Sequence, residues 1–515
     1  LALLARAHDQ APCSLRLASL LRLQHPLSVD LYIEKTLAHA RLIVLRLLGG
    51  SSYWSYGLDQ VEELARSRGI MLAVLPGDAA PDPDLARRST LGQPHYERLR
   101  QYLAAGGFEN ARGFLAYCRH LTDGAPLPPA AKPPAKAGVY RDTWATGKPG
   151  AALLFYNSVL DGGQSQPIDA LIDALQENGI GTRAFHVSSL KDPASLDVIH
   201  QGLAQQAPDV ILNATSFAVA SGGLEDPLRV YACPVLQVVL SGSSEQGWRA
   251  SSQGLSARDL AMNVVLPELD GRILSRAVSF KSDDQWHAET ECRIVTYRAV
   301  PDRVRYVASL AANWVELRRT PAQGRKIAIV LANYPNKDGR IANGVGYDTP
   351  ASTVAILKEL SNQGYMIANV PETGNALIEA LQRGPTNSAR PGKTRMGQAR
   401  LSLSDYHERF DKLPASVRSQ ISGRWGVPSG DPFFAVDAFH LPIAVLGNAA
   451  VAIQPARGYN IDPKASYHDP ALPPPHGYLA FYVWLTDVFG AQAIIHNGKH
   501  GNLEWLPGKA TALSE

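Results

Sequence analysis

The segment from His496 to Lys509 contains residue types that bind metal ions. His496 and His500 are four residues apart, and Glu504 follows four residues later. Imidazole and carboxylate ligands together suit divalent first-row metals. The asparagine and glycines among them disfavour a helix, so we expect a glycine-rich loop that leaves a buried strand and directs the three side chains at one metal ion. The alternative is that both histidines cap backbone carbonyls and that Glu504 lies in a surface turn.

Lys509 follows a Pro-Gly pair, which raises the question of phosphate binding. A P-loop requires four residues between its first glycine and a Gly-Lys-Ser/Thr sequence. Here six residues separate Gly501 from Gly508, and Ala510 follows the lysine. The sequence contains no Walker A motif elsewhere. Any ATP used with this chain is therefore expected on a partner subunit.

A second polar segment runs from Asn333 to Pro350, between a predicted strand and a predicted helix. Its glycines keep the backbone close to whatever it contacts, but they miss the GxGxxG spacing of a dinucleotide site. Arg340 offers a forked donor, Asn343 an amide and Asp348 an acceptor, so these three are candidate substrate-binding residues. The alternative for Asp348 is that it caps the helix beginning at Thr349.

A third polar segment, from Gln454 to Pro470, is a long loop with almost no apolar anchor. Loops of this length inside a compact domain are usually functional or disordered. Arg457, Tyr459 and Lys464 are candidate substrate-binding residues in it. His468 is a candidate proton acceptor, because histidine titrates near neutrality and the aspartate after it can fix its tautomer. The alternative is a solvated connector.

Apolar strands alternate with amphipathic helices around these segments. Strands separated by helices form parallel sheets that are covered on both faces. The predicted fold class is therefore α/β: a multi-domain chain of mostly parallel sheets flanked by helices, with repeated strand-loop-helix units. The predicted strands lie at 41–48, 70–75, 151–156, 181–187, 210–216, 235–242, 326–334, 365–370, 441–448, 449–458 and 491–496, and a nearly apolar helix at 473–490.

Shifts in composition divide the chain into four predicted parts. They are an N-terminal α/β domain (1–120), a proline-rich linker (121–148), a middle α/β domain (149–305) and a third α/β block (306–515). We expect a stiff linker, because five prolines fall between residues 126 and 134. The chain starts at Leu1 and stops soon after Lys509, so we expect a piece of a longer protein whose third block is truncated.

Composition and charge exclude several classes of protein. Hydrophobic residues make up 45% of the chain and charged residues 19%, as in ordinary globular proteins. The net charge of +3 is too balanced for a protein that binds a nucleic-acid backbone. The four cysteines form no CxxC pair, which disfavours a disulfide scaffold or thiolate zinc site and favours a reducing, cytoplasmic setting. No apolar run is long enough for a membrane span.

Five segments of the chain together resemble the family of CobN and the large magnesium chelatase subunit. They are HPLSVDLYIEKTLAHARLIVLRLLGG at 25, PVLQVVLSGSS at 234, LANYPNKDGRIANGVGYDTPAS at 331, QPARGYNIDPKASYHDP at 454 and HNGKHGNLEWLPGKA at 496. The last three are long, polar and specific. Magnesium chelatase members share a looser frame, HxGxHGxLExxPGK, and the residues at its variable positions here, such as Lys499 and Trp505, resemble the cobalt-inserting members more.

The resemblance implies an enzyme, a cobaltochelatase large subunit that inserts Co²⁺ into hydrogenobyrinic acid a,c-diamide in cobalamin biosynthesis. It implies that ATP and Mg²⁺ are held by an AAA+ partner, CobS, assisted by CobT, and that 306–515 begins the tetrapyrrole- and metal-binding domain. His496, His500 and Glu504 would supply metal ligands and bases, with His468 as a further proton acceptor; the clamps on substrate carboxylates would be Arg340, Arg457, Lys464 and Lys509. The alternatives are a large subunit for magnesium or another metal, and a tetrapyrrole-binding protein without chelation activity.

Overall fold

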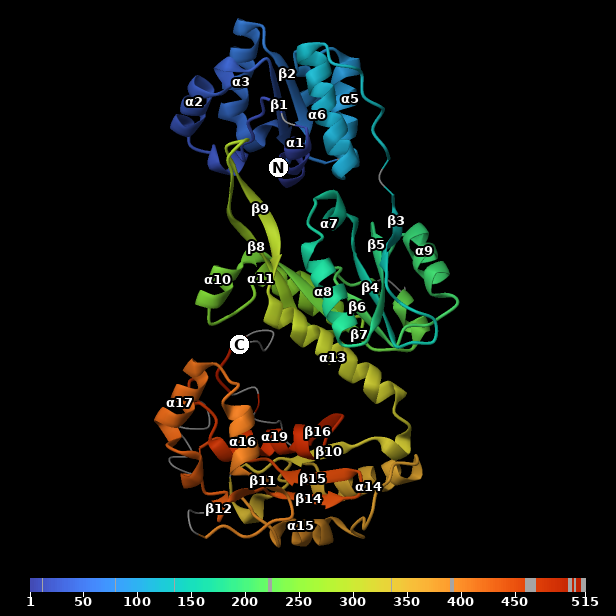
Figure 1. Ribbon diagram of the computed structural model, residues 1–515, viewed down its shortest axis with the longest axis vertical. Helices are drawn as coiled ribbons and strands as arrows, with labels where there is room; N and C mark the ends of the chain where they lie inside the picture. Colours follow the sequence, from blue (N-terminus) through green and yellow to red (C-terminus); the bar gives the residue numbers. More distant parts are fainter. Residues whose placement is uncertain are drawn as a thin grey trace. The chain divides into compact units, whose positions relative to one another are not determined.

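The structure is a computed structural model that describes every residue except 12, 79, 134, 221–224, 335, 390–392, 459–468, 499–502, 504, 505 and 511–515. The chain divides into two compact units (Figure 1). The first contains Leu1–Ser251 and Leu255–Ala312, and the second contains Ser252–Gly254 and Asn313–Glu515. Both units are built on sheets that are mostly parallel, which confirms the predicted fold class.

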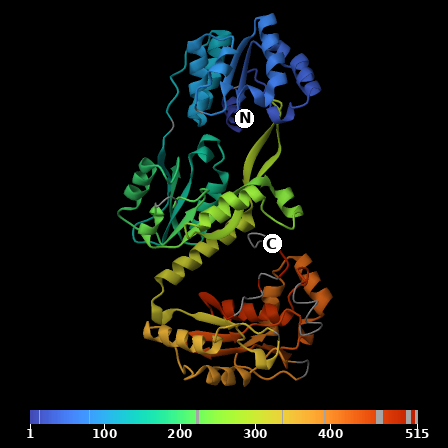
Figure 2. The same ribbon diagram turned by 180° about the vertical axis from the view of Figure 1, so that it is seen from behind.

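The first unit begins with the predicted strand-helix-strand motif. β1 (Leu42–Leu47) pairs in parallel with β2 (Met71–Pro76), and α3 (Ser55–Arg68) connects them. Because alternate residues of a strand face opposite sides, Ile43 packs with one group of helices and Val44 with another. The helices on the Ile43 side are α2 (Pro26–Lys35) and α3, and those on the Val44 side are α1 (Ala2–Gln10), α5 (Gln93–Ala105) and α6 (Phe108–Asp123) (Figure 2).

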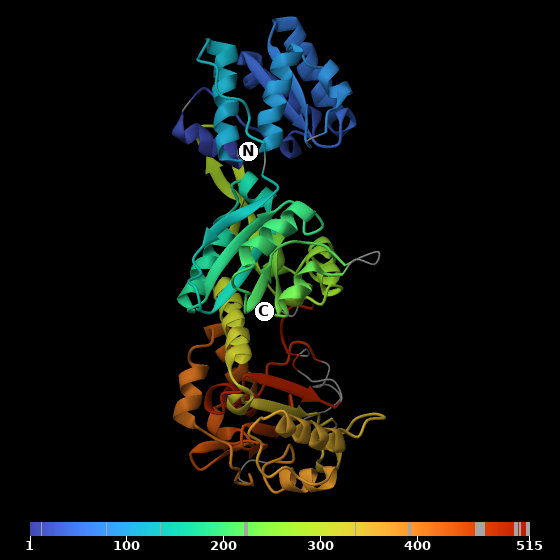
Figure 3. The ribbon, with the colours of Figure 1, turned by 90° about the vertical axis from the view of Figure 1, so that its right-hand side faces the viewer.

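A larger sheet follows in the same unit, with the strand order β3-β5-β4-β6-β7-β8-β9 (Figure 3). The strands from β5 to β8 in this order are parallel, and β3 and β9 are antiparallel edges. The four apolar strands predicted between 151 and 242 are confirmed as β4 to β7. The bounds are β3 (Ala137–Asp142), β4 (Gly150–Tyr156), β5 (Gly181–Val187), β6 (Val210–Asn213), β7 (Val235–Ser244), β8 (Ile273–His287) and β9 (Cys292–Ala299), with helices α8 (Gln166–Glu177) and α9 (Pro193–Leu203).

Two features of this unit differ from the predicted organisation. β3 lies inside the segment predicted as a linker, because its backbone completes the open edge beside β5. The β8–β9 hairpin reaches the N-terminal helices (Figure 2), where Leu17 N donates to Thr290 O over 3.0 Å. Ala5 and Leu17 share a small buried cluster with Cys292 of β9. These contacts join the predicted N-terminal and middle domains into one compact unit.

The second unit contains a sheet with the strand order β14-β15-β10-β16. β10 (Ile327–Leu331) is parallel to both β15 (Ala449–Ile453) and β16 (Ala493–Asn497), whereas β14 (Ile443–Leu446) is antiparallel. All four strands were predicted. A smaller antiparallel sheet was not predicted. Its strand order is β11 (Arg400–Ser402), β13 (Ala438–His440), β12 (Phe434–Ala435).

Each face of the β10 sheet has its own core. Ile327, Ile329 and Leu331 pack with α14 (Thr349–Asn362) and α15 (Gly374–Gln382). Ala328 and Val330 pack instead with a core that includes the predicted apolar helix. That core is formed with α16 (Leu403–Phe410), α17 (Ala415–Trp425), α19 (His476–Val483) and the π-helical turn Trp484–Val488.

The strand predicted at 365–370 is wrong. This segment makes a single bridge, between Ile367 and Gly447, and Asn369 adopts a left-handed φ of 54°. That conformation cannot continue a strand, and β14 already covers this edge of the sheet. The predicted boundary between 305 and 306 falls within one helix, α13 (Pro301–Arg319). In the part of the chain that is described, no helix has both the length and the hydrophobicity to cross a bilayer.

Candidate functional site

The three polar segments begin at one edge of the second unit's sheet. β10, β15 and β16 run in parallel, so their carboxyl ends lie together, and the register pairs Leu331 with both Ile453 and Asn497. The loop after each strand is one of the polar segments. The carboxyl edge of an open parallel sheet is where α/β proteins place their ligands. The candidate site is therefore this edge.

His496 is the next-to-last residue of β16 and is half-buried. Its ring stacks on the Tyr482 ring of α19, with 6.5 Å between centroids and 18° between planes. The Tyr482 hydroxyl in turn accepts a hydrogen bond from Gln454 Nε2 over 3.1 Å. The first of the predicted metal ligands thus stands at a strand end, on an aromatic support that is linked to the end of β15.

Two other predicted ligands, His500 and Glu504, lie outside the described residues, as do the candidates Tyr459, Lys464 and His468. Among the residues that are described, no three His, Cys, Asp or Glu side chains are close enough to hold a metal ion. The ligand set of His496, His500 and Glu504 stays a prediction.

The start of the His496–Lys509 loop is attached to α14. Asn497 Nδ2 donates to Thr353 Oγ1 over 2.9 Å, and Asn497 Oδ1 accepts from the Tyr347 hydroxyl over 3.1 Å. Gly498 has a φ of 115°, and a Cβ there would lie 3.0 Å from Thr349 Cγ2. Only glycine combines this backbone conformation with such a close approach to a helix.

The predicted residues of the Asn333–Pro350 segment differ in what they contact. Asp348 is the N-cap of α14, and its Oδ1 accepts from Ala351 N over 3.0 Å. Asn343 is half-buried and donates to Tyr334 O over 3.3 Å. Arg340 is exposed at the end of a short 3₁₀ turn. Arg340 is therefore the member of this set whose side chain is open to a ligand.

Arg457 and Lys509 occupy contrasting positions. Arg457 is 1% exposed, and its Nη2 donates to the carbonyls of Asp469, over 2.9 Å, and Leu472, over 3.4 Å. These bonds connect the two ends of the third polar segment. Lys509 is half-buried.

A buried amide that sequence reasoning missed connects two of the loops. Asn387 lies between α15 and β11 (Arg400–Ser402), outside every polar segment. Its Nδ2 donates to Asn333 Oδ1 over 2.7 Å and to Gln454 O over 2.8 Å, and its Oδ1 accepts from Ala456 N over 3.0 Å. The surrounding residues, Thr-Asn-Ser, form no recognisable motif, so sequence alone offers no signal for it.

A second support lies beneath α19, which carries Tyr482. His476 Nε2 contacts Gly426 O over 3.0 Å, and because a carbonyl only accepts, this nitrogen carries the proton. His476 Nδ1 then accepts from the Tyr406 hydroxyl over 2.6 Å. Burial lowers the pKa of His476 and raises the pKa of Tyr406, so both groups are neutral near pH 7.

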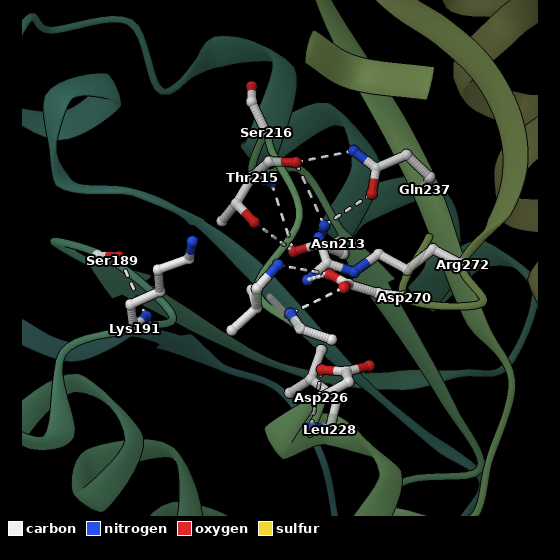
Figure 4. Close-up of polar contacts among 12 residues, drawn as sticks. Ser189, Lys191, Asn213, Thr215, Ser216, Asp226, Leu228, Gln237, Asp270 and Arg272 are labelled. Carbon is white, nitrogen blue, oxygen red and sulfur yellow. Dashed lines mark hydrogen bonds and ion pairs between the residues drawn. The ribbon is translucent and has the colours of Figure 1, made fainter. Parts of the chain in front are cut away.

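The first unit also has buried polar groups around its parallel strands β6, β7 and β8 (Figure 4). Asn213, the last residue of β6, donates to Gln237 Oε1 over 2.7 Å, and Gln237 Nε2 donates to Thr215 O over 2.7 Å. Beside them Arg272 Nη2 lies 3.0 Å from Asp270 Oδ2, and both side chains are fully buried. Burial lowers the pKa of Arg272, opposed by the charge of Asp270.

Comparison with known proteins gives consistent results. A family model described as CobN/Magnesium Chelatase matches residues 100–515. The aerobic cobaltochelatase subunit CobN of Sinorhizobium sp is 49% identical, over 99% of this chain and 42% of its own length. The CobN subunit of Pseudomonas aeruginosa is 43% identical, over 100% of this chain and 42% of its own. The magnesium-chelatase large (H-type) polypeptide of Chlorobaculum parvum is 26% identical over 70% of this chain.

A solved structure, the catalytic subunit of cobaltochelatase from Mycobacterium tuberculosis, superposes with a TM-score of 0.78 and 32% sequence identity. The match covers 100% of this chain and 43% of that one. The chain thus spans about two fifths of the length of the relatives that it matches. On the extent of the family match, this chain belongs to the CobN/magnesium chelatase family.

Proposed function

We propose that this chain is part of the substrate-binding and catalytic subunit of an ATP-dependent cobaltochelatase, which inserts Co²⁺ into hydrogenobyrinic acid a,c-diamide in cobalamin biosynthesis. The observation that carries the proposal is that three polar loops begin side by side, at the carboxyl ends of β10, β15 and β16. The relatives that are 49% and 43% identical to this chain bear the name cobaltochelatase subunit CobN.

Metal insertion makes three demands on such a site. The site must remove two protons from ring nitrogens, deliver a partly desolvated cation and hold the macrocycle. In the proposal the substrate Co²⁺ is ligated by His496, His500 and Glu504. The ring protons are accepted by the same three side chains together with His468. His496 suits this role because it stands at the strand end with its ring stacked on Tyr482.

The substrate carries peripheral carboxylates, which cationic side chains can clamp. We assign this contact to Arg340, Lys464 and Lys509, with polar contacts from Asn343 and Tyr459. Arg340 is exposed, as a clamp must be before substrate binds. Arg457 and Asp348 act in the proposal by shaping the loops, because their bonds go to backbone groups.

The partners in the proposal are an AAA+ subunit, CobS, which hydrolyses ATP with Mg²⁺, and CobT. The support is the sequence itself, in which no Walker A motif occurs. A setting in the cytoplasm, where these partners and the substrate are available, belongs to the same proposal.

The test is cobalt insertion by the complete subunit with both partners, ATP, Co²⁺ and hydrogenobyrinic acid a,c-diamide. His496→Ala is expected to lower kcat at least about 100-fold, as loss of a ligand or base does. His200→Ala is the matched control, because His200 also contacts a tyrosine ring, that of Tyr231 at 5.8 Å, but in the first unit. Unchanged turnover in His496→Ala would contradict the assignment of the site.

Two other outcomes identify the alternatives. Preference for Mg²⁺ or Ni²⁺ over Co²⁺ in competition would favour a chelatase for another metal. Tight binding of the corrinoid without insertion of any metal, with partners and ATP present, would favour a tetrapyrrole-binding protein without chelation activity.

A further inference from the structure

We propose that Asn387 is a positioning residue for metal insertion, which holds the loops after β10 and β15 in one arrangement. The kinetic part of this inference rests on the proposed function. Asn387 lies outside the three polar segments and is 6% exposed, so it acts on the site through the loops that it binds.

The carboxamide of Asn387 forms hydrogen bonds with two loops at once. Both hydrogens of Nδ2 have acceptors, Asn333 Oδ1 after β10 and Gln454 O after β15, at 2.7 and 2.8 Å. Its oxygen accepts from Ala456 N at 3.0 Å. Asn333 extends the connection, because its own Nδ2 donates to Lys337 O over 3.0 Å. An amide at this position therefore fixes the separation of the two strand ends.

The connection continues from Asn387 to the predicted metal ligand. Gln454, whose carbonyl accepts from Asn387, donates through its side chain to the Tyr482 hydroxyl at 3.1 Å. The Tyr482 ring stacks on His496. Ala456 immediately precedes Arg457, which joins the ends of the third polar segment. Releasing Asn387 would thus loosen both the support of His496 and the course of that segment.

The chemistry of the contact requires an amide. Asn387→Asp would direct a buried carboxylate at Asn333 Oδ1 and Gln454 O, two acceptors, in place of a donor. Asn387→Ala would leave the backbone N–H of Ala456 and the carbonyl of Gln454 without these partners. A misplacement of about 1 Å at a reacting centre costs on the order of 100-fold in rate.

Asn110 in the first unit offers a matched control. Its Nδ2 donates to Gly106 O and Lys132 O, over 2.8 and 3.0 Å, and its Oδ1 accepts from Lys132 N over 2.9 Å. It is 9% exposed, close to the value for Asn387. Asn110→Ala therefore removes the same kinds of bond from a buried amide whose hydrogen-bond partners, Gly106 and Lys132, lie in the first unit.

The experiment compares Asn387→Ala, Asn387→Asp and Asn110→Ala in the complete subunit with its partners, well below the melting temperature. We expect Asn387→Ala to lower kcat about 10- to 100-fold with a smaller change in KM for the corrinoid, and Asn387→Asp to be at least as impaired. Hydrogen exchange of residues 454–458 should accelerate in both. Asn110→Ala should keep kcat and this exchange within about twofold of wild type. Equal kcat values in Asn387→Ala and Asn110→Ala would overturn the proposal.

Failure of the proposed function would show itself differently, as a wild-type subunit that inserts no cobalt. Exchange of residues 454–458 and affinity for hydrogenobyrinic acid a,c-diamide then decide the role of Asn387. Faster exchange with weaker binding in Asn387→Ala, but not in Asn110→Ala, would support loop positioning. Unchanged exchange in Asn387→Ala would overturn it.

Discussion

The parallel sheets of the two units satisfy the buried polar groups beside them in different ways. In the first unit Asn213, Thr215 and Gln237 lie on β6, the loop after it and the neighbouring strand β7, so the network is local (Figure 4). In the second unit the bonds of Asn387 reach residues 54 and 67 positions away, in loops after two different strands. A local network stabilises a scaffold, whereas a long-range one also sets where loops lie. Buried polar groups thus indicate a site only when their partners lie in the loops that carry candidate residues.

The strongest test of this contrast is the buried ion pair of the first unit. Arg272→Met leaves the Asp270 carboxylate buried without its counterion, so we expect a loss of about 3–5 kcal/mol in the free energy of unfolding. The double variant Asp270→Asn with Arg272→Met should recover most of it, since it removes both charges. Denaturant titration of the first-unit transition measures both effects. A loss below about 1 kcal/mol in the single variant would show that the pair has little structural role.

Asn213→Ala tests whether the first network affects stability alone. It leaves Gln237 Oε1 and the Thr215 hydroxyl buried without their partner, which should cost about 1–3 kcal/mol. We expect kcat for cobalt insertion to stay within about twofold of wild type at a temperature where the variant is folded. A drop in kcat comparable to that of Asn387→Ala would remove the distinction between the two hydrogen-bond networks.

Gly498→Ala tests the attachment of the His496 loop to α14. The positive φ and the 3.0 Å approach to Thr349 together should cost about 1–3 kcal/mol of strain, which a displaced loop relieves. We expect kcat to fall clearly while the melting temperature changes little. Gly69→Ala is the control, since Gly69 has a φ of 66° and, apart from the two residues that flank it, no described residue has an atom within 4 Å of its Cβ position. If both variants behave alike, backbone conformation alone explains the effect.

The smallest expected effect is a pH dependence in the second unit. Burial lowers the pKa of His476 below its ordinary value of 6.5, so the unfolded chain binds this proton more readily. Its contribution is constant above pH 6.5 and is lost as the pH falls below that value, by at most about 1.4 kcal/mol per pH unit. Urea unfolding of the wild type between pH 7.5 and 5.5 should show a steeper loss than His476→Gln does. Parallel curves would assign the pH dependence to other groups.

Secondary structure was predicted correctly where the residues of a segment specify it by themselves, and missed where contacts with distant segments specify it. The strands β10 and β15 were predicted because continuous apolar runs specify strands that are buried on both faces. The apolar run AQAIIH also predicted β16, but as a buried strand, whereas β16 is a partly exposed edge strand. The strand at 365–370 failed because Asn369 takes a left-handed conformation in its tertiary setting. β8 escaped prediction because its outer half, SFKSDDQWH, is polar and is organised by pairing with β9.

The residues of the candidate site also divide into those that local sequence identifies and those that only the folded structure reveals. His496 and Arg340 were found from residue type and spacing, and the structure places His496 at the predicted strand end. Arg457 was also singled out, but residue type does not reveal its burial or its bonds to the carbonyls of Asp469 and Leu472, which depend on how the chain folds. Asn387 could not be found, because its importance arises only when the loops after β10 and β15 close around it.

The register of β16 has a consequence for how this edge tolerates change. Ile494 packs with the α19 core and Ala493 with the α14 core, so His496 and Asn497 are sent to opposite sides of the sheet. Deleting one residue between 490 and 493 would exchange the two faces, placing the imidazole against α14 and the amide against Tyr482. The length of this short connection is therefore more strictly constrained than the identity of any one residue in it. A natural or engineered variant with a different length would need to rebuild the contacts of β16 with both α14 and α19.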